Sequence, residues 1–233
     1  MGRYAAAAGW YGRANKAQAL GRARPKEQAR AAFNYGLALK RLGRWDRAVP
    51  ELEQACQFYE QSGDLEQAAD GRLVLGHIFL DARGYATALR HYEASYAGYR
   101  HPSSRPRAEL GIAMARIGLG RFSGLEEQLT ALYRDGQCDV RGYAGYALAA
   151  MLRQQGRVAE ALALSDEVLT LSSADLVLLA ANANERLVCQ LLRGDCAAAG
   201  ETLATLAPML EACEAPNGAL WWCAALFLRW ERG

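Results

Sequence analysis

The side chains of this sequence that could do acid–base or metal chemistry are few and scattered. The chain has three histidines, His77, His91 and His101, and no two of them have the spacing of a metal-binding or catalytic pair. We expect His91 to be exposed and His101 to lie in a loop. No catalytic role follows for any of them, because general acid–base chemistry needs a partner within hydrogen-bond reach.

Sequence motifs of enzyme sites are absent from the 233 residues. The chain lacks GxxxxGKS/T, GxSxG and HExxH, which hold phosphate, present a nucleophilic serine and bind zinc. The segment Gly118–Gly124 resembles a dinucleotide fingerprint, but its third glycine comes one residue late and no strand precedes it. We interpret it as a turn between helices, and we predict a protein that is not an enzyme and uses no cofactor.

The cysteines offer no better case for a metal or a disulfide framework. They form no CxxC pair, and in a chain of this length they are typical of reduced, small apolar residues. A zinc site built on Cys189 and Cys196 is not favoured, because their spacing matches no zinc pattern. The six are Cys56, Cys138, Cys189, Cys196, Cys213 and Cys223.

Charge and hydropathy narrow the class of protein. Residues 1–47 hold 11 Lys and Arg against 2 Asp and Glu, whereas residues 48–233 hold 16 against 23. This asymmetry could steer an acidic partner to the N-terminal end, but no nucleic-acid-binding signature accompanies it, so nucleic acid is not the expected partner. No apolar run approaches the roughly 20 residues of a membrane span, and the N-terminus lacks a signal peptide. We expect a soluble, cytoplasmic protein with no membrane partner.

A short pattern recurs along the chain at intervals of 34 to 40 residues. Each copy is a glycine-containing turn followed by an aromatic or smaller apolar residue, and in all copies but the fourth a small residue comes three positions later. The apolar positions are Tyr11, Trp45, Tyr85, Phe122, Val158 and Cys196. Self-similarity at such a period indicates a repeat architecture.

Each part of the pattern has a physical reason. Glycine ends a helix because it adopts the left-handed backbone conformation at little cost. The apolar residue opens the second helix of a pair, and the small residue sits where two helices cross closely. Gly36, Gly76 and Ala149 are the small residues expected on the first helices. Alanine and leucine dominate the composition, which favours an all-α fold.

These residues carry a family resemblance. The segment Asn34–Leu39, with Leu42–Trp45, Ala48 and Ala55, closely resembles a tetratricopeptide repeat (TPR). Copies near Asp70 and Tyr143 also resemble it, and those near 107 and 180 are degenerate, with Leu125 and Leu187 where small residues are usual. The resemblance implies a right-handed superhelical solenoid of antiparallel helix pairs.

About 13 helices are predicted within a single repeat domain over residues 1–233. A partial repeat at 1–28 precedes repeats at about 29–65, 66–104, 105–140, 141–173 and 174–214, and an unpaired helix at 217–231 follows. The helices are expected at 2–8, 10–22, 28–42, 45–60, 66–82, 85–99, 105–118, 122–134, 141–155, 158–171, 174–193, 196–211 and 217–231. Pro208 predicts a kink or an earlier end in its helix.

In this family the first helix of each pair lines a concave groove. Carried over to this sequence, the resemblance implies a groove of aromatic, aliphatic and polar side chains suited to a peptide with apolar anchors. A carboxylate clamp for chaperone tails is not expected. Only one of the positions that match the clamp carries a suitable charge, namely Arg107. The other matching positions hold Phe33, Leu37, Val74 and Gly111. The groove candidates are Arg30, Phe33, Asn34, Leu37, Arg41, Leu73, His77, Asp81, Arg107, Leu110, Met114, Tyr143, Tyr146, Arg153, Asn184 and Val188.

We expect both ends of the predicted repeat array to lack a capping helix. The helix predicted at 217–231 is apolar nearly all round, and no further helix follows to cover it, although a solenoid needs polar caps. One interpretation is that the chain is an excised piece of a longer protein. The other is that the apolar end self-associates around Trp221 and Trp230 or folds back on the array.

Two functions follow from the resemblance. The first is a non-catalytic scaffold that binds a protein or peptide in the groove, within a larger protein. The alternative is a ligand- or peptide-sensing arm of a bacterial transcriptional regulator, because repeats near 37 residues resemble the helical arrays of large bacterial activators. The sequence does not identify the ligand.

Overall fold

The secondary structure is helical throughout the part of the chain that the structure describes. The structure, a computed structural model, describes residues 5–6, 8–13, 25–136, 138–171 and 175–212. Within these ranges it has ten bounded α-helices, one 3₁₀ helix and no strand. The all-α prediction is confirmed, and the count of about thirteen helices is too high for these residues. None of the described helices combines the length and apolar character needed to cross a membrane.

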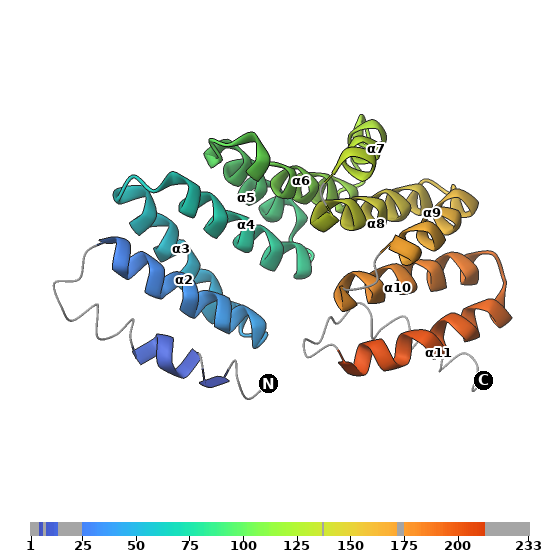
Figure 1. Cartoon of the computed structure of the whole chain (residues 1–233), viewed down its shortest axis with the longest axis horizontal. Coiled ribbons are helices and arrows are strands. Elements are labelled where there is room, and N and C mark those ends of the chain that lie inside the picture. The colour runs from blue at the N-terminus through green and yellow to red at the C-terminus, as the bar shows by residue number, and fades with distance from the viewer. Residues whose placement is uncertain (1–4, 7, 14–24, 137, 172–174, 213–233) are drawn as a thin grey trace. The chain divides into compact units, whose positions relative to one another are not determined.

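The chain forms two compact units, and the first spans Met1–Leu119. Consecutive helices of this unit pack against one another, and α4 also contacts α2 and α6, so the alternate helices adjoin (Figure 1). Its elements are α2 (Pro25–Arg41), α3 (Trp45–Gln61), α4 (Leu65–Asp81), α5 (Tyr85–Gly98), η1 (Pro102–Ser104) and α6 (Pro106–Gly118).

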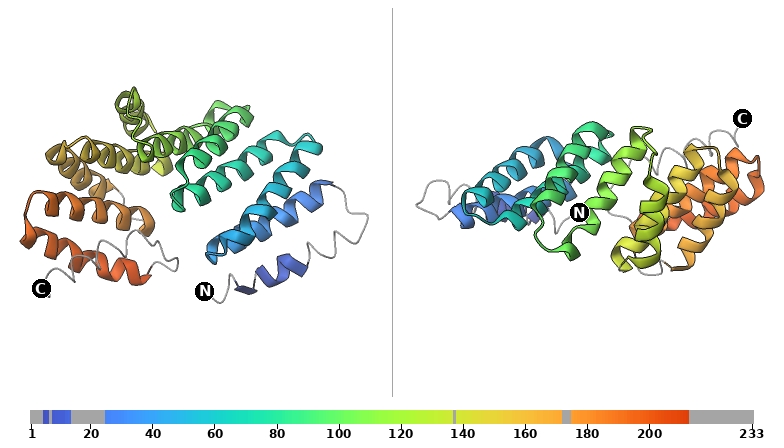
Figure 2. Two further views of the ribbon diagram at one scale, coloured as in Figure 1. Left: turned by 180° about the vertical axis from the view of Figure 1, so that it is seen from behind. Right: turned by 90° about the horizontal axis from the view of Figure 1, so that it is seen from above.

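The second unit spans Gly120–Gly233 and repeats this packing. Neighbouring helices in the sequence contact each other, and α10 contacts α8 as well as α9 and α11 (Figure 2). Its elements are α7 (Leu125–Asp135), α8 (Cys138–Gln154), α9 (Val158–Leu171), α10 (Leu176–Leu192) and α11 (Cys196–Ala212). The boundary between the units passes through the repeat predicted at 105–140, and the superhelical solenoid stays a prediction.

Several predicted helix ends differ from the structure, and α2 and α8 each begin three residues earlier than predicted. Residues 8–13 are continuously helical, so the predicted break at residue 9 is wrong, and most of the helix predicted at 10–22 lies outside the described residues. Helix α7 begins at Leu125, not at 122, after Gly124 adopts a left-handed φ of 71°. Helix α11 continues through Pro208, so the earlier end is wrong. The helix predicted at 217–231, with Trp221 and Trp230, lies outside the described residues.

The turns within the helix pairs share one backbone design. In the first complete pair, the N–H of Arg44 donates to the carbonyl of Leu39 at 3.0 Å, and Gly43 takes a left-handed φ of 70°. This is a Schellman motif, which satisfies carbonyls at the helix end. The turn after α4 departs from the prediction, because Arg83, with φ 59°, takes the left-handed conformation and Gly84 does not.

Small residues bring the helices close together as predicted. Ala48, Ala88, Ala161 and Ala199 are each fully buried. A Cβ atom on Gly36 would lie 2.6 Å from Cγ of Leu52, so the first helix crosses the second at van der Waals contact. The apolar residues Trp45, Tyr85, Val158 and Cys196 each open a helix, which confirms the pattern in these four copies. The Phe122 copy lies before the start of its helix, and Tyr11 lies inside the continuous helical stretch 8–13.

The cores lie between these crossing helices. In unit 1 one cluster groups Leu39, Leu52, Leu75 and Ile78, and another is centred on Tyr92. In unit 2 Ala183, Leu187 and Leu203 pack between α10 and α11. The repeat pattern therefore builds a series of small cores, each shared by neighbouring helix pairs.

Candidate functional site

Tyr92 on α5 occupies the space between two first helices of unit 1. A Cβ atom on Gly76 of α4 would lie 2.6 Å from its Cε1, and one on Gly111 of α6 would lie 2.5 Å from its Cδ1. The two glycines thus make room for the ring, which is fully buried. In the preceding pair the same contact is made by Leu52 against Gly36. Tyrosine therefore fills a position at which an aliphatic side chain also suffices for packing.

The hydroxyl of Tyr92 has no partner. Its Oη is buried and makes no hydrogen bond. An unsatisfied buried polar group costs about 1–3 kcal/mol of stability. Burial, with a smaller contribution from Asp81, raises the pKa of Tyr92 above its usual range, so the group stays a neutral hydroxyl with a proton to donate. The packing of the fold does not explain this oxygen.

His77 on α4 lies beside that ring. The imidazole and the Tyr92 ring meet edge to face, with centroids 5.5 Å apart. Burial, with smaller contributions from the positive charges of Lys40 and Arg107, lowers the pKa of His77 to about 4. His77 is thus a neutral imidazole at neutral pH, with one N–H donor and one acceptor nitrogen.

Lys40 and Asp81 complete the group from α2 and from the end of α4. Burial lowers the pKa of Lys40, and the charge of Asp81 opposes that shift. Asp81 is exposed to solvent, yet the surrounding protein desolvates it enough to raise its pKa, against the effect of Lys40. We call Lys40, His77, Asp81, Tyr92 and Arg107 the His77 cluster. It draws one side chain each from α2, α5 and α6 and two from α4.

The comparable face of unit 2 is built from paired charges. Arg153 of α8 forms a hydrogen-bonded ion pair through its Nε with Oε1 of Glu185 on α10, and the Glu185 side chain is only 4% exposed. Burial raises the pKa of Glu185 although Arg153 opposes the shift. Tyr143 donates to Oδ2 of Asp175 at 3.0 Å, and Asp175 in turn caps α10 by accepting from the backbone N–H of Val177 at 3.0 Å. These contacts tie α8 to α10.

Two asparagines of α10 keep buried acceptors without partners. Oδ1 of Asn184 and Oδ1 of Asn182 make no hydrogen bond, although Nδ2 of Asn182 donates to the carbonyl of Leu178 at 3.1 Å. Asn182 is fully buried, whereas Asn184 is half-buried. The Asn184 side chain is thus partly exposed, but its unpartnered Oδ1 is buried.

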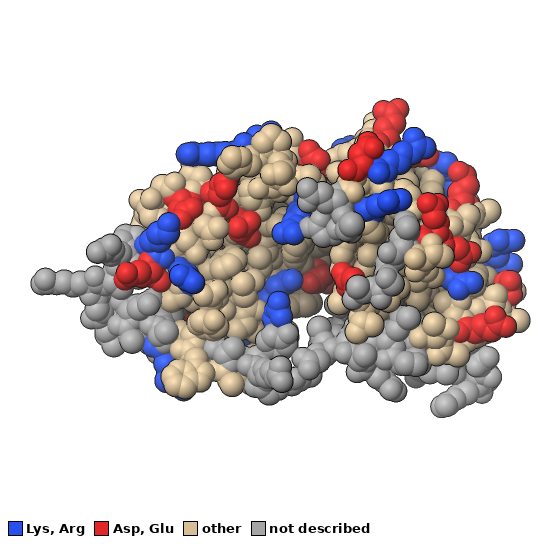
Figure 3. Space-filling view, in the orientation of Figure 1, with Lys and Arg blue, Asp and Glu red and all other residues tan. Residues whose placement is uncertain are grey.

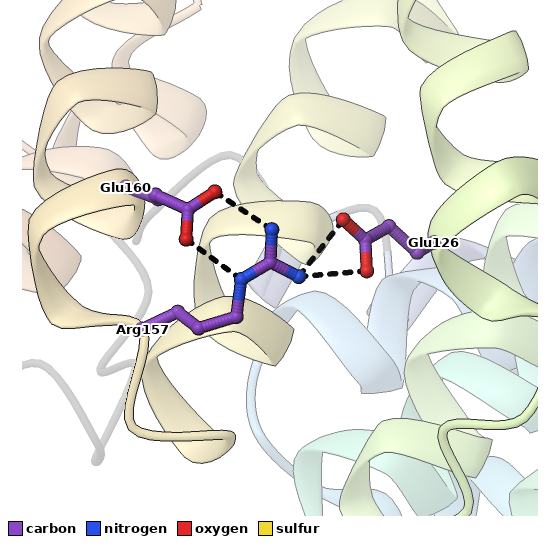
Figure 4. A network of polar contacts seen from close by, with 3 residues as sticks. All are labelled: Glu126, Arg157 and Glu160. Carbon is purple, nitrogen blue, oxygen red and sulfur yellow. Dashed lines mark hydrogen bonds and ion pairs between the residues drawn. The ribbon is translucent and has the colours of Figure 1, made fainter.

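An exposed network joins the start of α7 to the start of α9. Arg157 donates from Nη1 to both carboxylate oxygens of Glu126, at 2.7 and 2.9 Å, and from Nε and Nη2 to Glu160 (Figure 4). The hydrogen bonds to the two glutamates raise the pKa of Arg157, so it stays charged at every accessible pH. All three guanidinium nitrogens therefore donate to carboxylates of unit 2.

Two of the predicted groove residues lie in the core, and the rest are at least partly exposed. Leu73 and Leu110 are buried, at 7% and 8% exposure. Charges of both signs are interspersed with uncharged surface in the view of Figure 3. The candidates that are exposed or half-buried are Arg30, Phe33, Asn34, Leu37, Arg41, His77, Asp81, Arg107, Met114, Tyr143, Tyr146, Arg153, Asn184 and Val188.

The other two histidines have simpler surroundings. His91, expected to be exposed, is half-buried and stacks on Phe79 with centroids 5.3 Å apart. His101 directly precedes η1 and is exposed, in agreement with the loop prediction. Within the described residues, no three His, Cys, Asp or Glu side chains gather as metal ligands would.

Sequence reasoning missed Lys40 and Tyr92. Lys40 follows Leu37 by three residues, a helical spacing that places both on one side of α2 and could have identified it. Tyr92 carries a weaker signal, since a tyrosine at a core position of the second helix is typical of packing. Only the three-dimensional packing against Gly76, Gly111 and His77 shows that its hydroxyl is buried without a partner.

Compared with known proteins, the sequence matches no family model and no curated protein. The tetratricopeptide-repeat assignment therefore stays a prediction.

Proposed function

We propose that the chain is a non-catalytic binding domain that takes a protein or peptide ligand on the side of its first helices. The observation that carries this proposal is the set of partly exposed side chains on the first helices of unit 1. Phe33, Leu37 and Met114 are half-buried apolar groups beside the cores, and Asn34 and His77 are half-buried polar groups on the same helices.

The chemistry of these side chains supports a peptide-like ligand. Leu37 and Met114 are half-buried apolar groups that could seat side chains, and Asn34 offers both a donor and an acceptor. Met adapts its shape to different partners.

A peptide selection tests the proposal. The full 233-residue chain is used to select binders from a random peptide library, and the affinities of the enriched peptides are measured by fluorescence anisotropy. Leu37→Ser and Met114→Ser should each weaken binding about tenfold, since each removes one buried apolar anchor. Circular dichroism confirms that both variants keep their helices.

The control is Leu192→Ser at the end of α10, where the leucine is 61% exposed. It should leave affinity unchanged. The proposal is contradicted if no peptide is enriched, or if peptides bind the two first-helix variants as tightly as the parent chain.

A further inference from the structure

We propose that the His77 cluster binds an anionic group, a carboxylate or a phosphoryl group carried by the ligand. This inference rests on the proposed function and names the chemistry of one subsite. Lys40, His77 and Tyr92 supply the donors. None of the three stands at a position matching the carboxylate clamp of the family that the sequence resembles.

The first argument is the surplus hydroxyl. Tyr92 does the packing work that Leu52 does in the preceding pair, and it adds a buried O–H without an acceptor. The hydroxyl lies at the end of a ring whose edge-to-face neighbour is the half-buried His77. Tyr92 therefore holds an unused donor next to an imidazole that is partly open to solvent.

The second argument is the sign of the field at this point. The charges that act on His77 are those of Lys40 and Arg107, and both are positive. Arg41 adds a third positive charge beside Lys40. A neutral histidine in a positive field, next to an unused hydroxyl, is a pair of donors that favours an anion.

Asp81 is the acidic member of the cluster. Its charge acts on Lys40 and on Tyr92. A bound anion competes with Asp81 for the Lys40 ammonium. Removing the charge of Asp81 should therefore strengthen anion binding, which a purely structural role for the cluster does not predict.

The experiment uses small anions as probes, so that it does not depend on knowing the ligand. The histidine ring signals of the full chain are followed by NMR during titration with inorganic phosphate or with sodium acetate, and a sodium chloride titration at matched ionic strength is the reference. We expect a saturable change at His77 and none of that size at His91 or His101. The bound anion should raise the pKa of His77 towards its ordinary range, because it offsets the charges of Lys40 and Arg107.

Variants assign the donors. Tyr92→Phe and Lys40→Met should each weaken the anion affinity about fivefold or more, and Asp81→Asn should strengthen it by a similar factor. Lys26→Met is the matched control, since Lys26 lies at the other end of α2 and pairs with Asp64 at 2.9 Å. Tyr92→Phe should keep or raise the melting temperature, because it removes an unsatisfied hydroxyl.

Each outcome decides the question. A response to phosphate alone assigns a phosphoryl group, and a response to acetate alone, or to both, assigns a carboxylate-sized site. The inference is overturned if His77 responds as it does to chloride, or if Tyr92→Phe and Lys40→Met bind as the parent does. Peptides that bind without needing an acidic or phosphorylated residue would overturn this inference but leave the proposed function standing. Anion binding without any peptide binding would do the reverse.

Discussion

Arg83 occupies, in the turn after α4, the left-handed backbone position that Gly43 occupies in the turn after α2. The two turns form the same hydrogen bond, from the N–H of Gly84 to the carbonyl of Phe79 at 2.8 Å and from that of Arg44 to Leu39 at 3.0 Å. An arginine in this conformation carries steric strain that a glycine does not, since its Cβ approaches the following carbonyl oxygen.

Arg83→Gly should therefore stabilise the protein by about 1 kcal/mol. Urea unfolding followed by circular dichroism measures the change. Arg44→Gly is the matched control, because Arg44 stands one position later in its turn with a φ of −88° and should not gain stability. Equal effects of the two substitutions would contradict the strain at Arg83.

Gly76→Ala should destabilise unit 1 by about 2 kcal/mol or more. The new methyl group would lie 2.6 Å from the Tyr92 ring, which is fully buried and also packs closely against Gly111. Gly200→Ala is the control, because nothing lies within 4 Å of a Cβ at this position of α11. That change should raise stability by about 0.5–1 kcal/mol, since alanine is the better helix former. Thermal unfolding of the parent chain and the two variants measures the effects. If both substitutions shift the melting temperature in the same direction, the close contact between Gly76 and Tyr92 is contradicted.

Arg153→Ala should destabilise unit 2 by about 3 kcal/mol, because it leaves the charge of buried Glu185 without a partner. The control is Arg186→Ala, which removes the more exposed ion pair of Arg186 with Asp166 on the neighbouring helices. That loss should stay below about 1 kcal/mol. Replacing both partners, Arg153→Met with Glu185→Leu, should recover much of the lost stability, and chemical unfolding of the double variant would contradict this account if the losses simply added.

Stability should fall with acidity partly through His77. Its pKa is about 4 in the folded chain, against about 6.5 for an unfolded chain. Above about pH 7 both states are neutral and the residue has no effect. Between about pH 6.5 and 4 the unfolded chain binds the proton first, so stability is lost over this window and levels off below it. The loss is about 2 kcal/mol once solvent contact of the half-buried ring is allowed for.

The measurement is the difference in unfolding free energy between the parent and His77→Gln across pH 4 to 8. As the pH falls through this window, the parent should lose stability relative to His77→Gln. Other titrating groups contribute equally to both proteins. A difference that does not depend on pH would contradict the lowered pKa of His77.

The helix positions were largely readable from the sequence, and the reasons are local. Glycine turns and the residues that open second helices, such as Trp45 and Tyr85, act through backbone conformation and short-range packing. The same rule failed at Phe122, because Ser123 and Gly124 delay α7 until Leu125. Helical periodicity gives the side of a helix on which a residue lies, but it does not say what meets the polar end of its side chain. Tyr92 is the clearest example.

The candidate site was readable only in part for a related reason. His77 and Asp81 lie on one side of α4, and their spacing of four residues shows this directly. Whether Leu73 and Leu110 reach a surface depends on how closely neighbouring first helices approach, which is set by the glycines opposite Tyr92. That approach is a property of three helices together and has no local signature.

Each unit contains a buried thiol whose reaction with an alkylating reagent reports the opening of that unit. Cys56 in unit 1 donates to the carbonyl of Ala68 at 3.6 Å and is 4% exposed, and Cys189 in unit 2 is fully buried. Burial raises the pKa of each to about 11, so neither reacts with an alkylating reagent while its helices stay closed. The labelling rates of these two cysteines therefore time the opening of one unit separately from that of the other, without any introduced probe.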